Sequence, residues 1–313
     1  MAIARPAASV AAALAVGAAF VWSTYYVFVV WLGPLVLPVA TIVYPFLFGG
    51  IAFLALAWAR GDAGSFARLW VEPAAWARIL LIATLQTATV AATYAIGPID
   101  SSLLALLGDV IAVPLLLMAV YGEDRPLLRS PWFVAGVVAC LVGGGLSIVA
   151  GHPLTPVHGW ALVVIPAIPL TIGFYFLLTA RAARTAPATV LNGQAFLGAA
   201  VVIAVLSPLF PGGARGLGEL SWEAVGLFVA LGLSTFFVAQ WLYFIAIGRG
   251  GLVSTAIWMS LIPAFTLLLS VVVLGIAPVI LGALGVPIAV AGAFIALEGQ
   301  RRVGEPAAPS STG

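Results

Sequence analysis

The chain has 313 residues, of which 64% are hydrophobic and 7% are charged, whereas soluble domains carry roughly 25% charged residues. A mean hydropathy of +1.22 excludes a water-soluble globular fold, because too little polar surface is available to cover the core. The net charge of +2 gives no reason to expect a nucleic-acid partner, and the absence of lysine excludes a Walker-type phosphate loop. We therefore predict an all-α membrane protein.

Ten apolar segments lie along the chain, and each is close to the roughly 20 residues that a membrane helix needs. The first charge-free run, from Pro6 to Ala59, is too long for one helix and is divided by Gly33-Pro34 and Pro38. A cleaved signal peptide is the competing interpretation of the first segment. The expected membrane helices span residues 9–31, 35–58, 77–97, 101–121, 132–150, 158–180, 187–209, 223–247, 252–274 and 278–298.

The arginines indicate how these helices are oriented. With the N-terminus inside, eleven of the twelve arginines fall on the cytoplasmic side and only Arg215 falls outside, in line with the positive-inside rule. We predict a multi-pass protein of the inner membrane with both termini cytoplasmic and a disordered tail at 303–313. Every arginine is expected at a helix end or in a loop, so no fixed cation is expected inside the membrane, which disfavours phosphorylated substrates.

The sequence divides into two related halves of five helices, 1–150 and 151–302. Because five is an odd number, the second half enters the membrane from the opposite face, which predicts an inverted-topology repeat. In this scheme Asp100 lies in an outer turn and Arg249 in the matching inner turn. A shift of 149 residues pairs Tyr26 with Tyr175, Pro38 with Pro187, Tyr94 with Tyr243, Pro114 with Pro263, Gly136 with Gly285 and Gly143 with Gly292.

Several short motifs lie at the ends and centres of these segments. They are Val21-Trp22-Ser23-Thr24, Pro114 with Tyr121-Gly122-Glu123, Gly136 with Gly143, Ile262-Pro263-Ala264-Phe265, and Gly285 with Gly292. In this order and spacing the chain resembles the drug/metabolite transporter (DMT) superfamily, EamA type. The resemblance implies ten membrane helices and secondary transport of small metabolites, often export. The acidic residue that closes the ninth helix in that family is replaced here by Leu274-Gly275-Ile276.

Asp109 is the one carboxylate expected near the middle of the membrane. It lies eight residues after the expected helix start at Ser101, or about 12 Å deep, in a hydrocarbon core whose half-thickness is about 15 Å. An ionised carboxylate there costs about 2.5–3.5 kcal/mol. Asp109 therefore suits proton coupling or the binding of a substrate amine, and the alternative is a hydrogen bond that serves helix packing.

Other polar and aromatic residues are expected to face the same interior. Each occurs at helical spacing within an apolar segment, where polar groups must face protein or a water-filled cavity. For any single one of them, a hydrogen bond between helices is an equal alternative. The candidates for substrate binding or coupling are Asp109, Trp22, Tyr26, Gln86, Thr89, Thr93, Thr171, Tyr175, Gln240, Tyr243 and Trp258, with Asn192 and Gln194 at shallower depth.

Two ladders of small residues lie in the last helix of each half. One consists of Gly136, Cys140 and Gly144, and the other of Gly285, Ala289 and Ala293. Small residues at this spacing allow two helices to approach closely. They predict either packing between the two halves or a homodimer contact through helices 5 and 10, and the alternative is the ordinary Gly- and Ala-rich composition of membrane helices.

Together these features predict a secondary transporter rather than an enzyme. We expect it to move a small neutral, zwitterionic or cationic metabolite or drug by alternating access, with no cofactor, metal or nucleic acid. Its partners would be the substrate, with a coupled proton as one option at Asp109, and the bilayer. The alternatives from other classes are a membrane-embedded enzyme acting on lipid-linked substrates and a flippase or scaffold of similar fold.

Overall fold

The structure is a computed structural model, and part of the chain is described by it. The described residues are 6–66, 70–108, 129–151, 161–182, 185–209, 217–218, 220–250, 255, 258–276 and 278–304. Within them all regular structure is helical. The helix α14 continues to Gly304, so residues 303 and 304 of the expected tail are helical, and the rest of that tail lies outside the described ranges.

Proline begins many of these helices. It occupies the first or second helical position of α2, α4, α5 and α13, where its missing N–H has no helical partner to lose. The elements are α1 Pro6–Leu32, α2 Pro38–Ala59, η1 Asp62–Ser65, α4 Pro73–Ile96, α5 Pro98–Leu107, α7 Pro131–Gly151, α8 Ala161–Ala182, α9 Ala188–Leu206, η4 Ser207–Leu209, α10 Trp222–Leu231, η6 Gly232–Ala239, α11 Gln240–Gly250, α13 Ile262–Val272 and α14 Ile280–Gly304.

Each of the predicted apolar segments overlaps a helix of the described residues. Six helical stretches are long and apolar enough to cross a membrane, among them Trp222–Arg249, which combines α10, η6 and α11. Four further helices, α5, α7, α8 and α13, are apolar over 10–17 residues within the described ranges, which is shorter than a full membrane span. The chain is thus a multi-pass membrane protein by helix length and composition, and the count of ten spans stays a prediction.

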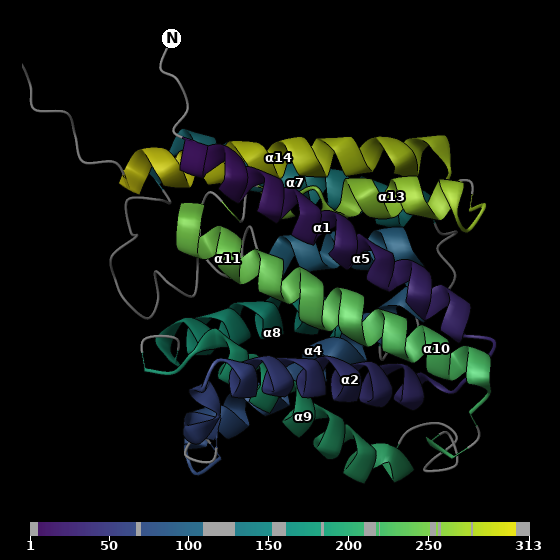
Figure 1. Cartoon of the computed structure of the whole chain (residues 1–313). Coiled ribbons are helices and arrows are strands. Elements are labelled where there is room, and N and C mark those ends of the chain that lie inside the picture. Colours follow the sequence, from purple (N-terminus) through teal and green to yellow (C-terminus); the bar gives the residue numbers. More distant parts are fainter. Residues whose placement is uncertain are drawn as a thin grey trace, which may run out of the picture.

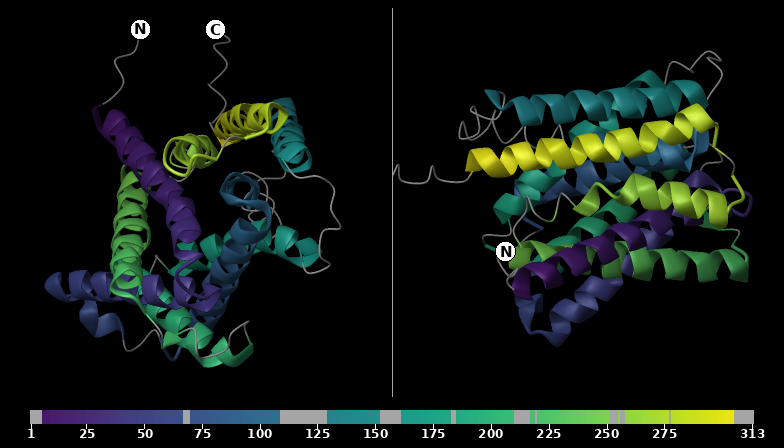
Figure 2. Two further views of the ribbon diagram at one scale, coloured as in Figure 1. Left: turned by 90° about the vertical axis from the view of Figure 1, so that its right-hand side faces the viewer. Right: turned by 90° about the horizontal axis from the view of Figure 1, so that it is seen from above.

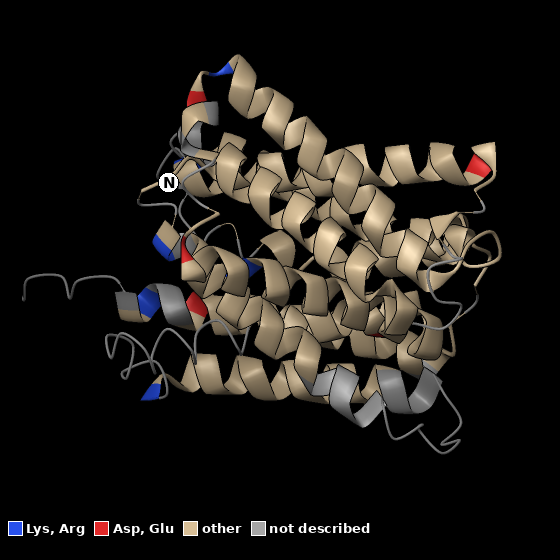
Figure 3. Ribbon diagram, turned by 90° about the horizontal axis from the view of Figure 1, so that it is seen from below, with Lys and Arg blue, Asp and Glu red and all other residues tan. Residues whose placement is uncertain are grey.

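The helices form a bundle with two opposite edges. In Figure 1, α7 and α14 form one edge, α2 and α9 form the other, and α1 and α11 cross the space between them. The end-on view in Figure 2 keeps the same two pairs at opposite edges. In Figure 3 the arginines of the described segments lie toward the end of the bundle at which the N-terminus lies. That distribution agrees with the predicted grouping of arginines on one side.

The edge formed by α7 and α14 is packed backbone to backbone. A methyl group built on Gly143 would lie 2.4 Å from the Ala289 nitrogen, and one on Gly136 would lie 2.2 Å from the Ala296 nitrogen. The Cys140 thiol donates to the Ala289 carbonyl at 3.2 Å. Of the two roles predicted for the small-residue ladders, packing within the chain is therefore the one observed for Gly136 and Cys140, whereas Gly144 of the predicted ladder has nothing within 4 Å of its added methyl group.

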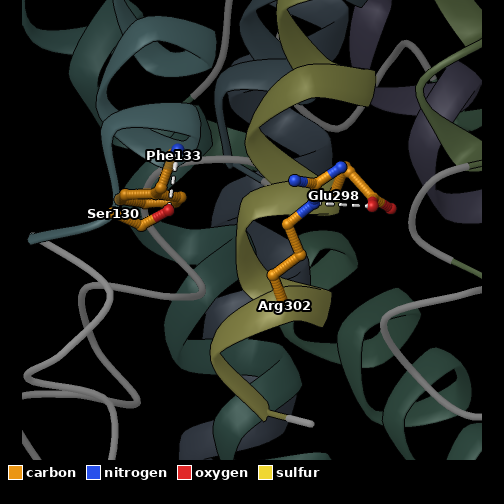
Figure 4. A network of polar contacts seen from close by, with 4 residues as sticks. All are labelled: Ser130, Phe133, Glu298 and Arg302. Carbon is orange, nitrogen blue, oxygen red and sulfur yellow. Dashed lines mark hydrogen bonds and ion pairs between the residues drawn. The ribbon is translucent and has the colours of Figure 1, made fainter. Parts of the chain in front are cut away.

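Polar contacts lie at one end of this edge, near the start of α7 and in the last turns of α14 (Figure 4). Arg302 Nε donates to Glu298 Oε1 at 3.0 Å, and the Arg302 guanidinium lies 4.8 Å from the centre of the Trp132 ring. The Phe133 amide lies 3.4 Å from Ser130 Oγ. Exposed ion pairs of this kind contribute little stability, so the glycine contacts carry the packing of this edge.

At the opposite edge, one long helical stretch contains a π-helical segment. Residues Gly232–Ala239 form the π-helix η6 between α10 and α11. A methyl group on Gly232 would lie 2.8 Å from the Pro45 carbonyl, so α2 passes against the backbone of η6. π-turns are frequent at functional sites, and here Thr235 and Phe236 of η6 and Gln240 at the start of α11 line the interior of the bundle.

Candidate functional site

A cavity of about 150 Å³ lies between the two edges of the bundle. Side chains from α1, α4, α5, α8, α9, η6, α11 and α13 line it. Six of the residues predicted from sequence are on its wall, from four separate elements of the chain. They are Trp22, Tyr26, Gln86, Thr89, Tyr175 and Gln240.

The wall contributed by α4 presents an amide and a hydroxyl. Gln86 Nε2 donates to the phenolic oxygen of Tyr25, and Thr89 Oγ1 donates back to the Leu85 carbonyl at 2.8 Å. Tyr25 and Tyr26 pack edge to face with their ring centres 5.1 Å apart. This wall can therefore hydrogen-bond a small polar group while aromatic faces enclose the rest of it.

The opposite wall is organised around Asn192 on α9. Its Oδ1 accepts long hydrogen bonds from Tyr175 Oη and Gln240 Nε2, both at 3.5 Å, and its Nδ2 donates to the Ala188 carbonyl at 2.7 Å. Asn192 is fully buried. Contacts of 3.5 Å are weak, so Tyr175 and Gln240 can exchange Asn192 for a ligand at small cost.

Four predicted residues of the described segments are not on the cavity wall. Thr93 donates to the Thr89 carbonyl at 2.8 Å, and Thr171 donates to the Ala167 carbonyl at 2.6 Å. Tyr243 packs on Trp22 with ring centres 5.2 Å apart, and Trp258 packs edge-on against Phe294 at 6.2 Å. These four side chains therefore either bond to the backbone of their own helix or pack on aromatic rings of other helices. Asp109 lies outside the described residues.

Two charged residues are placed differently from the sequence prediction. Asp100 was expected in an outer turn, but α5 begins at Pro98 after Gly97 with φ +88°. Asp100 therefore lies in the first helical turn, 6% exposed, and accepts a hydrogen bond of 2.8 Å from Ser147. Asp100 is thus a buried carboxylate of the described bundle that the sequence had placed in a loop.

Arg78 is the second correction. Every arginine was expected at a helix end or in a loop, but α4 begins at Pro73, so Arg78 lies in its second turn. Its side chain is 1% exposed and donates to Gln194 Oε1 at 3.2 Å. The prediction that no arginine lies inside the bundle is therefore wrong.

Sequence reasoning missed part of the cavity wall. Tyr25 could have been found, because it follows Trp22 by three residues and shares its helix face. Thr235 could also have been found, because the shift of 149 residues pairs it with Gln86. Phe196 and Phe236 line the cavity as well, but nothing distinguishes them in sequence from the other phenylalanines of an apolar chain.

Comparisons with known proteins agree with this architecture. Residues 159–297 match the model of the EamA-like transporter family, so the resemblance inferred from sequence is confirmed. A solved crystal structure of a protein with 22% sequence identity aligns with 95% of this chain and 99% of its own, at a TM-score of 0.68. At that identity the likeness supports the fold alone. No curated protein sequence gave a significant match.

Proposed function

Since residues 159–297 match the model of the EamA-like transporter family, we propose that this protein is a secondary carrier for a small molecule. The central cavity carries the proposal. It is apolar and aromatic over most of its wall, with a few hydrogen-bonding groups from several helices, which is the composition of small-molecule sites. The substrate would lie between Gln86 and Thr89 on one side and Tyr175 and Gln240 on the other.

An inverted repeat of two five-helix halves would supply the mechanism. The contact of Gly136 with Gly292 becomes the contact of Gly285 with Gly143 when 149 is added to one residue and subtracted from the other. Cys140 and Ala289, which are in contact, differ by 149 and exchange with each other. Such reciprocity is expected of two halves related by a pseudo-two-fold axis, and it supports alternating access. The grouping of the arginines toward one end of the bundle favours cytoplasmic termini.

Two threonines on α4 provide a matched test. Thr89 and Thr87 both donate to the carbonyl four residues earlier, at 2.8 Å, but only Thr89 is on the cavity wall. We would reconstitute the protein in proteoliposomes and screen labelled amino acids, amines and carboxylic acids for counterflow. For a transported compound, Thr89→Val should weaken apparent affinity about fivefold, since one hydrogen bond contributes about 1 kcal/mol.

Thr87→Val should transport like the natural protein. An equal effect of the two substitutions would place the substrate away from the cavity. Absence of counterflow for every compound in the screen, with correctly folded protein, would contradict the carrier itself.

A further inference from the structure

Arg78 is a buried cation whose hydrogen bonds are incomplete. Its side chain is 1% exposed, its Nη2 donates to Gln194, and its Nε has no hydrogen-bond partner. Within the described part of the chain Arg78 forms no ion pair; the exposed Glu72 before α4 acts on it only through its field. A buried guanidinium without a counter-charge is strongly disfavoured, so an anion arriving there would be bound well.

An unused donor lies beside this guanidinium. Gln194 accepts a hydrogen bond from Arg78 through Oε1, and its Nε2 has no hydrogen-bond partner. Gln194 is buried, at 1% exposed. A guanidinium N–H and an amide N–H match the acceptor oxygens of a carboxylate.

The position of Arg78 connects it to the central cavity. Ile82, Gln86 and Thr89 line the cavity at four, eight and eleven residues after Arg78, so all four share one face of α4. One helical turn, about 6 Å, separates Arg78 from Ile82. Tyr175 is on the cavity wall and also interacts electrostatically with Arg78. Arg78 is not on the cavity wall itself, but it lies one helical turn beyond Ile82, toward the start of α4.

We propose that Arg78 is an anion-binding residue of the transport site and receives the carboxylate of a substrate whose apolar part occupies the aromatic cavity. This inference rests on the proposed function and narrows its substrate class to molecules with a carboxylate, zwitterions included. The planar fork of arginine suits a carboxylate better than the point charge of lysine does.

Thermal unfolding of the purified full chain in detergent tests this directly. Benzoate, acetate and the uncharged benzamide would be titrated at constant ionic strength against sodium chloride. Benzoate should raise the unfolding midpoint in a saturable way, acetate should act more weakly because it leaves the aromatic wall uncovered, and benzamide should have little effect. The apparent Kd for benzoate should rise at least tenfold in Arg78→Gln and less in Arg78→Lys.

Arg249→Gln is the matched control, because it removes the same charge at an exposed position and should leave the benzoate Kd unchanged. Arg78→Gln keeps a hydrogen-bonding partner for Gln194, so a midpoint without ligand that is equal to or higher than that of the natural protein verifies its folding; should it fail to fold, Arg78→Lys against Arg249→Lys decides. Equal benzoate affinity with and without Arg78, or no saturable response to either carboxylate, would overturn the inference. The titration measures binding and needs no transport. Counterflow in proteoliposomes can therefore succeed while the benzoate titration fails, so the test of the Arg78 site is distinct from the test of the carrier.

Discussion

Thr235 shows how one side chain can be unfavourable for folding and favourable for binding. It is 2% exposed, lies on the cavity wall in the π-helix, and its hydroxyl has no hydrogen-bond partner among the described residues. A buried hydroxyl without a partner costs about 1–3 kcal/mol. We predict that Thr235→Val leaves thermal stability unchanged or higher and weakens the apparent affinity for a transported compound about fivefold in counterflow.

Thr266 is the matched control for that prediction. It is also fully buried with a hydroxyl that lacks a partner, but it lies on α13 and is not on the cavity wall. Thr266→Val should change stability as Thr235→Val does and leave transport affinity as it was. A loss of affinity in both variants would show that the effect comes through helix packing and not through the substrate.

The sequence predicted residues well where polarity stands out from an apolar background. Gln86, Thr89 and Gln240 were found because a polar group inside a membrane helix needs a protein or cavity partner. Arg78 was misplaced because its segment was expected to begin at 77, whereas α4 begins at Pro73. A shift of four residues moves a side chain by about one turn, which here separates a solvated helix end from the interior.

The pairing of α7 with α14 depends on glycines at defined positions. A methyl group on Gly143 would meet the backbone of Ala289 at 2.4 Å, whereas a methyl group on the neighbouring Gly144 would meet nothing within 4 Å. Backbone atoms cannot rotate away as a side chain can, so the two helices would have to separate. Gly143→Ala should therefore destabilise the protein by about 1–3 kcal/mol, measured as a lower midpoint of thermal unfolding in detergent.

Gly144→Ala serves as the control. It places the same methyl group one residue away in open space, and alanine is the better helix former by about 0.5–1 kcal/mol. Its unfolding midpoint should be unchanged or slightly raised. If Gly143→Ala were equally well tolerated, close packing at this edge would not hold the two helices together.

Helix type was less predictable than helix location. The stretch 223–247 was expected as one continuous helix, and the structure contains it as α10, η6 and α11. The π-turn has no signature in hydropathy, because it depends on how the backbone of α2 passes Gly232. The ladders of small residues on α7 and α14, in contrast, were visible in sequence because close helix approach requires them.

At the level of the bundle, the edge formed by α7 and α14 and the edge formed by α2 and α9 flank a cavity whose tyrosines are nearly inaccessible. Tyr26 and Tyr175 are 4% and 3% exposed although both are on the cavity wall. The shift of 149 residues pairs these two positions, so a rocking motion of the halves would open the cavity beside each in turn. Alternating access therefore requires water to reach both positions in some state of the protein.

Cysteine accessibility can measure that opening. In a Cys140→Ala background, Tyr26→Cys and Tyr175→Cys should react with a membrane-impermeant thiol reagent, because only the thiolate reacts and it forms in water. Ile51→Cys is the control: Ile51 is 49% exposed on an apolar helix, so lipid should surround it and its labelling should be at least tenfold slower. A transported compound should protect both cavity positions and leave Ile51→Cys unaffected, since a ligand between Tyr26 and Tyr175 excludes the reagent. If both cavity positions labelled as slowly as Ile51→Cys and gained no protection, the tyrosines would be permanent packing residues, and the substrate path would have to lie elsewhere in the bundle.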